Sequence, residues 1–202
     1  MERPGRTKTG SARGVERRKL ILSATSDLIA AHGVGGLRLN AVAERAGIGR
    51  PGLLHHFPNK DALLHAVLDE HQQTVGAALG GIAAHGGLRS VRALAEIARY
   101  DVRDRLKAAV WSELVSDGAR PDSVLHDRLI DAYESYLAGT RSFLEAAIVD
   151  GEVRADADLD QETILIVGMI RGLETSWLLD ERVPLVELVE RVLDQTIQRL
   201  RA

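Results

Sequence analysis

Four basic side chains lie within one short segment of the chain: Arg50, His55, His56 and Lys60. Guanidinium and ammonium groups bind phosphates, imidazoles donate and accept hydrogen bonds, and imidazoles also bind metal ions. On a helix, His55 and His56 would diverge by about 100°, so they could not easily share one ion. The segment therefore favours hydrogen bonds to a polyanion over a metal site. The alternative is that Arg50 and Lys60 are ordinary solvated charges.

Other catalytic or metal-binding chemistry has little support in the sequence. His65 and Asp69 are one helical turn apart, but such a pair is more often a solvated helix face than a metal site. The chain has no cysteine and contains no HExxH, GxSxG or P-loop motif, which weakens the rival hypothesis of an all-helical enzyme. We therefore expect no metal, no cofactor and no enzymatic activity.

The charges are divided unevenly along the chain. Residues 1–60 hold 11 Lys or Arg and 4 Asp or Glu, a net charge of +7, so the other 142 residues of this −3 chain carry −10. This asymmetry is expected when the N-terminal part binds a polyanion. The alternative is a basic disordered tail alone, and we expect residues 1–14 to form such a tail.

The sequence predicts that the elements that position the basic segment are helices. Apolar spacing predicts one helix over 15–32, ended by Gly33, and a short helix over 39–46, ended by Gly47. A third helix follows over 50–57, with Gly49 at its start and Pro51 in its first turn.

The third helix has two unlike faces. Leu53, Leu54 and Phe57 share an apolar face, whereas Gly52, His55 and His56 lie opposite. A helix, a turn with glycine and a second short helix form a helix-turn-helix, whose second helix enters the major groove of DNA. Two turns suffice, because only the first residues and the exposed edge reach the bases.

The segment AERAGIGRPGLLHHFPNKDALLHAV, residues 43–67, resembles the DNA-binding domain of TetR-family transcriptional regulators. The resemblance implies an all-α fold, with an N-terminal three-helix helix-turn-helix domain at 15–75. A C-terminal helical bundle for ligand binding and dimerisation would follow at 76–202. It also implies that the chain is a repressor released from its operator by a small molecule. The alternatives are an effector-independent DNA-binding protein and an activator of the same fold.

The resemblance also implies where DNA is contacted. Arg50 and His55 would face base edges or nearby phosphates, His56 would lie at the backbone, and Lys60 would reach a phosphate. The full predicted surface comprises Arg38, Asn40, Gly49, Arg50, Pro51, Gly52, His55, His56 and Lys60.

Three positions of the predicted DNA-binding domain depart from the family pattern. Leu54 replaces a usual tyrosine, so one backbone contact is missing, and Gly52 replaces a common threonine. Arg38 stands where a capping threonine is common, so either Asn40 caps the second helix or that helix starts weakly.

The rest of the chain predicts helices near 88–100, 104–117, 122–149, 160–180 and 184–201. Aromatic residues are few and gather here, with polar tips such as Glu113 among them, as a pocket for a small molecule requires. The candidate ligand-binding residues are Tyr100, Trp111, Tyr133, Tyr136, Thr140 and Met169. The alternative is an ordinary core.

The last two predicted helices carry a further pattern. Gly168, Gly172 and Ser176 recur at intervals of four, which allows another backbone to approach closely. The resemblance implies that the helices near 160–180 and 184–201 form a homodimer, which would read a palindromic operator of double-stranded DNA. The alternative is packing within one chain.

No segment of the sequence indicates a membrane or an export signal. The longest apolar run, ILIVGMI at 164–170, is far shorter than the roughly 20 residues that span a bilayer. The N-terminal segment MERPGRTKTGSARG is basic and polar, without the apolar core of a secretory signal. We therefore expect a cytoplasmic protein without membrane contact.

Overall fold

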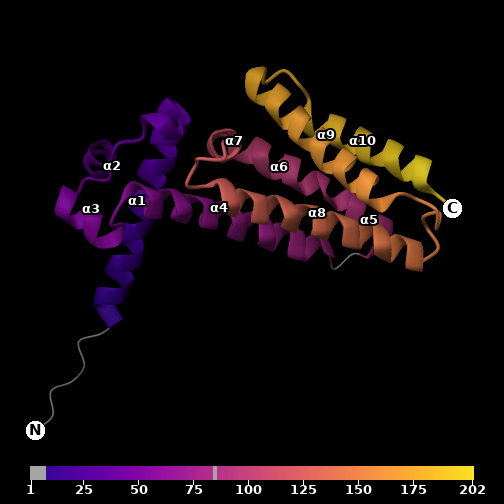
Figure 1. The fold of residues 1–202 in the computed structure, drawn as a ribbon, viewed down its shortest axis with the longest axis horizontal. Coiled ribbons are helices and arrows are strands. Elements are labelled where there is room, and N and C mark those ends of the chain that lie inside the picture. The colour runs from indigo at the N-terminus through magenta and orange to yellow at the C-terminus, as the bar shows by residue number, and fades with distance from the viewer. Residues whose placement is uncertain (1–7, 84–85) are drawn as a thin grey trace, which may run out of the picture. The chain divides into compact units, whose positions relative to one another are not determined.

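The computed structural model describes residues 8–83 and 86–202, and the regular secondary structure of this part of the chain is helical, apart from one isolated bridge between Val153 and Arg201 (Figure 1). The helices are α1 (Lys8–Gly36), α2 (Leu39–Arg45), α3 (Arg50–His56), α4 (Lys60–Ala83), α5 (Gly87–Ala93), α6 (Ala95–Arg103), α7 (Arg105–Gly118), α8 (His126–Val149), α9 (Leu159–Leu179) and α10 (Leu185–Leu200). The predicted all-α fold is confirmed. Among these described helices, none is long and apolar enough to cross a bilayer.

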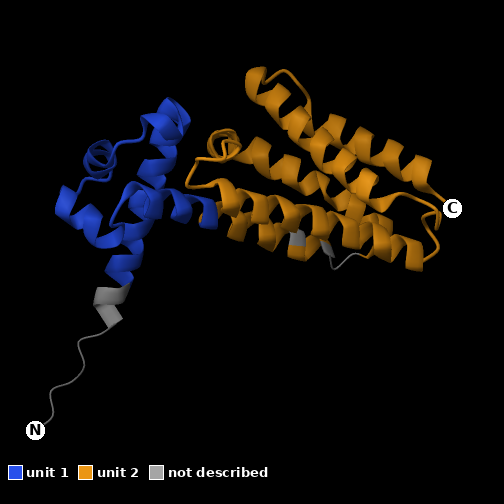
Figure 2. Ribbon diagram, viewed as in Figure 1, with its two compact units in different colours: residues 1–69 blue, residues 70–202 orange. Residues whose placement is uncertain are grey.

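The chain divides into two compact units, residues 1–69 and 70–202 (Figure 2). The division falls within α4, because this helix begins at Lys60 and continues to Ala83. It lies somewhat earlier than the sequence-based boundary after residue 75.

The first helix differs from its prediction at the N-terminus. Residues 8–14, expected to belong to a disordered tail, lie in α1. They contain no proline, and lysine, alanine and arginine favour helix, so nothing local stops α1 from beginning early. Residues 1–7 of the predicted tail lie outside the described residues. At the other end, Gly33 interrupts the helix with a φ of 69°, as its sequence position predicts.

The second and third helices form as the spacing predicts. Gly47, at φ 64°, makes the turn after α2, and Gly49 precedes α3. Leu53 and Phe57 are buried at 0% and 1% exposure, while Leu54 and Ile48 are only half-buried. Two apolar side chains therefore hold α3 against the unit.

The ends of these helices show which capping alternative is correct. The N-cap of α2 is Arg38, without a side-chain hydrogen bond, so Asn40 is not the cap and the helix start is the weaker one. In contrast, the Asn59 side chain accepts a hydrogen bond of 2.8 Å from the backbone N–H of Ala62 and caps α4.

The C-terminal unit is a helical bundle in which α9 packs between α8 and α10, and α5 lies against α8 (Figure 1). The predicted helix near 88–100 is two helices, α5 and α6, which meet at Leu94. The apolar side of α10 is buried in the core of its own chain, as Val189, Leu193 and Ile197 show. A bidentate ion pair between Arg199 and the buried Glu162 connects α10 to α9.

Replacing Asn59 by alanine should destabilise the N-terminal unit by about 1 kcal/mol, because a backbone N–H of α4 loses its acceptor. Chemical denaturation followed by circular dichroism measures this change. Asn59→Asp is the matched control, since its carboxylate can cap the helix and suits the positive end of the helix dipole. Equal loss of stability in both variants would contradict the capping role.

Candidate nucleic-acid interface and internal cavity

One side of α3 is exposed and carries most of the predicted contact residues. Arg50 and His55 are exposed, and so are Gly49, Pro51 and Gly52, which offer backbone without bulky side chains. From behind, the Arg18 guanidinium lies 4.4 Å from the centre of the Phe57 ring and adds a cation–π contact to the packing. A short, firmly seated helix thus presents a guanidinium and an imidazole to solvent.

Arg50 is joined to the start of α2. Its guanidinium donates a hydrogen bond of 3.0 Å to the side-chain oxygen of Asn40. Arg38 is exposed at the N-cap of the same helix. The structure therefore brings Asn40 and Arg50 together at the starts of α2 and α3, and Arg38 lies two residues before Asn40.

Lys60 has a structural contact that the sequence did not indicate. Its ammonium group donates a hydrogen bond of 2.7 Å to the backbone carbonyl of Val34, beyond the break in α1. An ammonium has three donors, so the group could bind a phosphate as well. The half-buried His56 packs edge-on to the His55 ring at a centroid distance of 5.6 Å.

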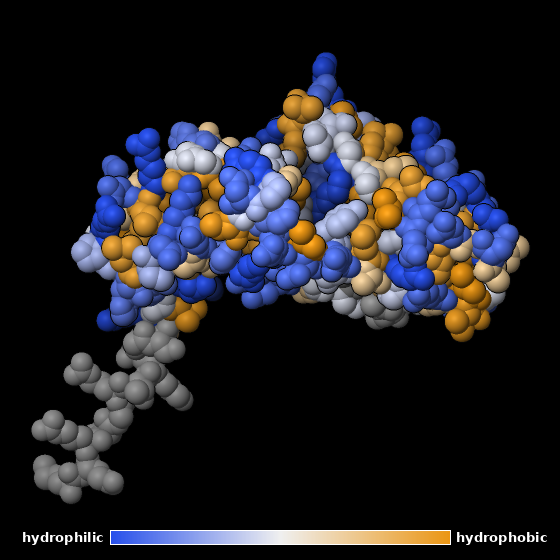
Figure 3. Space-filling model, viewed as in Figure 1, coloured by the Kyte–Doolittle hydropathy of each residue, from blue (hydrophilic) through white to orange (hydrophobic). Residues whose placement is uncertain are grey.

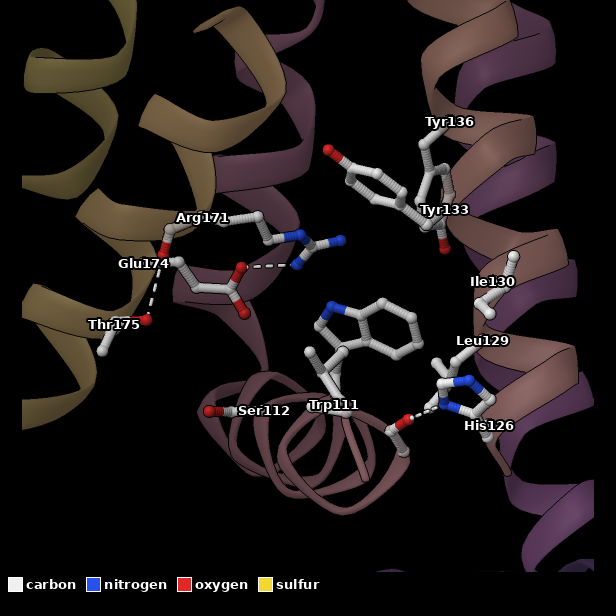
Figure 4. A pocket seen from close by; sticks show the side chains of 13 residues that line it. Trp111, Ser112, His126, Leu129, Ile130, Tyr133, Tyr136, Arg171, Glu174 and Thr175 are labelled. Atoms are coloured by element: carbon white, nitrogen blue, oxygen red, sulfur yellow. Dashed lines mark hydrogen bonds and ion pairs between the residues drawn. The ribbon is translucent and has the colours of Figure 1, made fainter. Parts of the chain in front are cut away.

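The C-terminal unit contains a cavity of about 440 Å³ between α7, α8 and α9. Its lining is mostly apolar and aromatic, with a few polar groups, as in pockets for small molecules. The lining residues are Trp111, Ser112, Val115, Gly118, Ala119, His126, Leu129, Ile130, Tyr133, Tyr136, Arg171, Glu174 and Thr175. Figure 4 shows tyrosines from α8, Trp111 from α7 and a charged pair from α9 around one space.

The predicted ligand-binding residues divide into two groups. Trp111, Tyr133 and Tyr136 line this cavity, and Thr140 joins Tyr136 at a second cavity of about 30 Å³. Tyr100 and Met169 line neither of these two cavities.

Two of the polar side chains expected at the pocket lie away from both cavities. Glu113 is exposed and does not line the cavities described above, because it lies on the outer side of α7. Tyr100 is half-buried on α6, with the Lys107 ammonium 5.6 Å from its ring centre.

Arg171 and Glu174 are the polar centre of the cavity, and sequence reasoning did not place them there. The guanidinium donates a hydrogen bond of 2.5 Å to the carboxylate of Glu174, whose side chain is only 5% exposed. It also lies 5.0 Å from the ring centre of Trp111 and 5.8 Å from that of Tyr136. The available signal was that Arg171 and Glu174 are the two charged residues of α9 after its first turn.

Buried titratable groups surround this pair. Burial and the nearby Glu174 carboxylate, opposed in part by the Arg171 guanidinium, raise the pKa of Asp101 to about 7. Burial, assisted by Arg171 and Lys107, lowers the pKa of His71 to about 3. The His71 ring stacks on Trp111 at 4.2 Å between centroids. No cluster of three or more potential metal ligands occurs in residues 8–83 and 86–202.

Two family models match the chain on either side of its unit boundary. Residues 21–67 match the model described as "Bacterial regulatory proteins, tetR family". Residues 87–202, more than half of the chain, match that of the "BetI-type transcriptional repressor, C-terminal". The chain belongs to the TetR family. The family consists of DNA-binding transcriptional regulators, not enzymes, as the sequence predicted.

Individual relatives agree with this membership. The TetR-type chain is 28% identical to the HTH-type transcriptional regulator SrpR of Pseudomonas putida, over 81% of this chain and 76% of the relative. It is 25% identical to the HTH-type transcriptional regulator TtgR of Pseudomonas putida, over 92% of each. Its fold is similar to that of the SmeT–triclosan complex, with a TM-score of 0.80, 19% identity and coverage of 93% and 92%.

Two of the buried groups with shifted pKa values, Asp101 and His71, should act oppositely on the stability of this TetR-family protein. Folded Asp101 keeps a proton that the unfolded chain releases between about pH 4 and 7, so the free energy of unfolding falls as pH rises through this range. The unfolded chain protonates His71 below about pH 6.5 and the folded chain does not, so this contribution rises with pH from about 3 to 6.5.

Asp101→Asn should therefore remove one falling contribution, while Glu174, whose pKa burial also raises, keeps another. The variant should gain up to about 4 kcal/mol over the parent protein near pH 8, and its free energy of unfolding should fall less steeply with pH between about 4 and 7. Urea denaturation at a series of pH values measures both effects. Asp122→Asn, which changes an exposed carboxylate, should leave the pH profile as it is; an unchanged profile for Asp101→Asn would refute the assignment.

Proposed function

We propose that this regulator is a repressor that leaves its operator when a small, largely apolar molecule enters the cavity of the C-terminal unit. The observation that carries the proposal is the cavity of about 440 Å³ with its aromatic walls, in the same chain as an exposed α3. A core that served packing alone would be filled to high density.

Two of the comparisons support a repressor with an effector pocket. The model matched by residues 87–202 is described as that of a repressor. The solved structure of similar fold is a complex of SmeT with triclosan, so this fold can hold a small molecule. Both agree with an effector pocket in the C-terminal unit.

We infer that the functional form is a homodimer whose interface centres on α9. This helix exposes Ile164 at 53%, Leu165 at 44% and Leu179 at 85%, and its Gly168 and Gly172 are exposed as well. Apolar side chains also interrupt the hydrophilic surface over the C-terminal unit (Figure 3). From α10 only the half-buried Leu188 and Val192 are available, since the rest of its apolar stripe packs within the chain. A two-fold pair of α3 helices would read a palindromic operator.

In this proposal, polar residues at the start of α2 and along α3 recognise the DNA sequence. Arg50, steadied by Asn40, and His55 contact base edges, while Arg38, His56 and Lys60 contact the phosphate backbone. Gly49, Pro51 and Gly52 let the backbone come close. An effector acts only through a difference in its affinity for the DNA-bound and released states. A shift from 99% to 1% competent protein requires about 5.5 kcal/mol of such preference.

The decisive experiment selects a DNA site from random oligonucleotides and then titrates the purified protein onto it, with and without a panel of small aromatic compounds. We expect a palindromic site, and at least one compound that weakens binding without unfolding the protein. Size-exclusion chromatography should give a dimer. If compounds bind the protein but all leave its DNA affinity unchanged, the repressor-release proposal fails, and the effector-independent alternative stands.

Arg50→Ala and Lys60→Ala should weaken DNA binding in different ways. Loss of Arg50 should relax the preference at one operator position by about 1–3 kcal/mol. Loss of Lys60 should weaken all sequences alike and lower the salt slope by about one. Fluorescence anisotropy with a set of single-base operator variants measures both.

Arg182→Ala, an exposed arginine of the C-terminal unit, is the control and should change neither quantity. Because Lys60 also holds the Val34 carbonyl, its variant is compared at a temperature at which circular dichroism shows it folded. Identical effects of the Arg50 and Lys60 variants on every sequence would contradict the assigned roles.

A further inference from the structure

The indole N–H of Trp111 is a buried donor without an acceptor. The side chain is 4% exposed, and no described protein group accepts a hydrogen bond from its Nε1 atom. A buried donor left in this state destabilises a protein by about 1–3 kcal/mol, so such groups are rare and often functional. Trp111 also lines the large cavity.

The neighbours of Trp111 hold its ring in place without satisfying this donor. His71 stacks on the ring with an angle of 5° between planes, and Tyr136 meets it edge-on at 6.1 Å. In Figure 4 the indole nitrogen lies on the side of the ring where Arg171 and Glu174 enter the cavity. The Tyr136 hydroxyl, which lines the same cavity, is also without a partner among the described residues. Two unsatisfied polar groups therefore belong to side chains that line the same cavity.

The ion pair of Arg171 and Glu174 disfavours an ionic ligand beside these groups in the cavity. A cation would seek the faces of Trp111 and Tyr136, but the guanidinium of Arg171 already occupies the neighbourhood of both rings. An anion would have to approach the buried carboxyl groups of Glu174 and Asp101, which interact with each other and with this single guanidinium. A neutral acceptor meets neither obstacle.

We propose that the effector is a neutral aromatic molecule with an acceptor oxygen, such as a carbonyl, that takes the hydrogen bond of the Trp111 indole N–H. The inference rests on the proposed function, in that the large cavity is taken as the effector site. Val115, Leu129 and Ile130 then hold the apolar body of the molecule, and the Tyr136 hydroxyl is a second polar contact.

Three probes of one shape test the inference: benzophenone, diphenylmethane and aminodiphenylmethane. They carry the same two rings, but the carbon between them bears a carbonyl oxygen, only hydrogen, or an ammonium group at neutral pH. Calorimetric titration of the DNA-free dimer should show benzophenone binding at least about tenfold more tightly than either of the others. Tightest binding of the amine would show that the carboxyl groups decide, and equal affinity of all three would show that no acceptor is needed; either result overturns the proposal.

Trp111→Phe should reduce the preference for benzophenone over diphenylmethane to about twofold or less, because it removes the donor and keeps an aromatic ring. Trp177→Phe is the matched control: Trp177 is buried at 6% exposure, lines neither of the two cavities, and its variant should keep the full preference. A preference that survives in Trp111→Phe contradicts the inference.

The control variant also reports on the donor directly, so the test does not depend on Trp111→Phe being folded. In Trp177→Phe the remaining indole N–H signal in a ¹H–¹⁵N spectrum belongs to Trp111. Benzophenone should move this proton downfield, and diphenylmethane should not. No downfield shift with bound benzophenone overturns the proposal. DNA release is measured separately, so a carbonyl preference without release refutes the proposed function alone.

Discussion

The burial of Leu53 and Phe57 behind α3 is the contact on which the N-terminal unit depends. A helix of seven residues has too few internal hydrogen bonds to be stable in water, so tertiary packing must keep it helical. The two buried side chains do so at 0% and 1% exposure, and the Arg18 guanidinium covers the Phe57 ring. Because only one side of the helix is used for packing, the other side is free to present Arg50 and His55.

The basic groups of this unit support its fold as well as its charge. Lys60 joins the start of α4 to the Val34 carbonyl, which no longer lies within a regular helix after the break at Gly33. Arg45 pairs with Asp27 at 2.7 Å and connects α2 to α1. Both cations are therefore held by contacts within the unit. The positive charge of residues 1–60 therefore has two uses, which net charge alone does not reveal.

Sequence reasoning predicted the helices well, because apolar spacing, glycines and prolines act locally. It placed the turn at Gly47 and the buried Leu53, both of which depend on near neighbours. The cavity was found only in part. Trp111, Tyr133 and Tyr136 stood out as rare aromatic residues, but Arg171 and Glu174 reach it from another helix. Which face of α9 turns inward depends on its packing between α8 and α10, and local spacing does not contain that information.

The polar cluster around Arg171 is unfavourable for stability, and this bears on how a ligand could act. Asp101 and Glu174 are buried beside one guanidinium, and the Asp101 carboxyl and the Trp111 indole both keep an unpaired polar atom. Well-packed apolar residues often stabilise a core as much or more. A cluster left unsatisfied in the unliganded protein can gain more from a bound acceptor than a satisfied one could. The Trp111 ring in this cluster stacks on His71 of α4. Under the proposed function, a ligand that satisfies these polar groups better in one conformation than in the other would supply the difference in affinity that release from DNA requires.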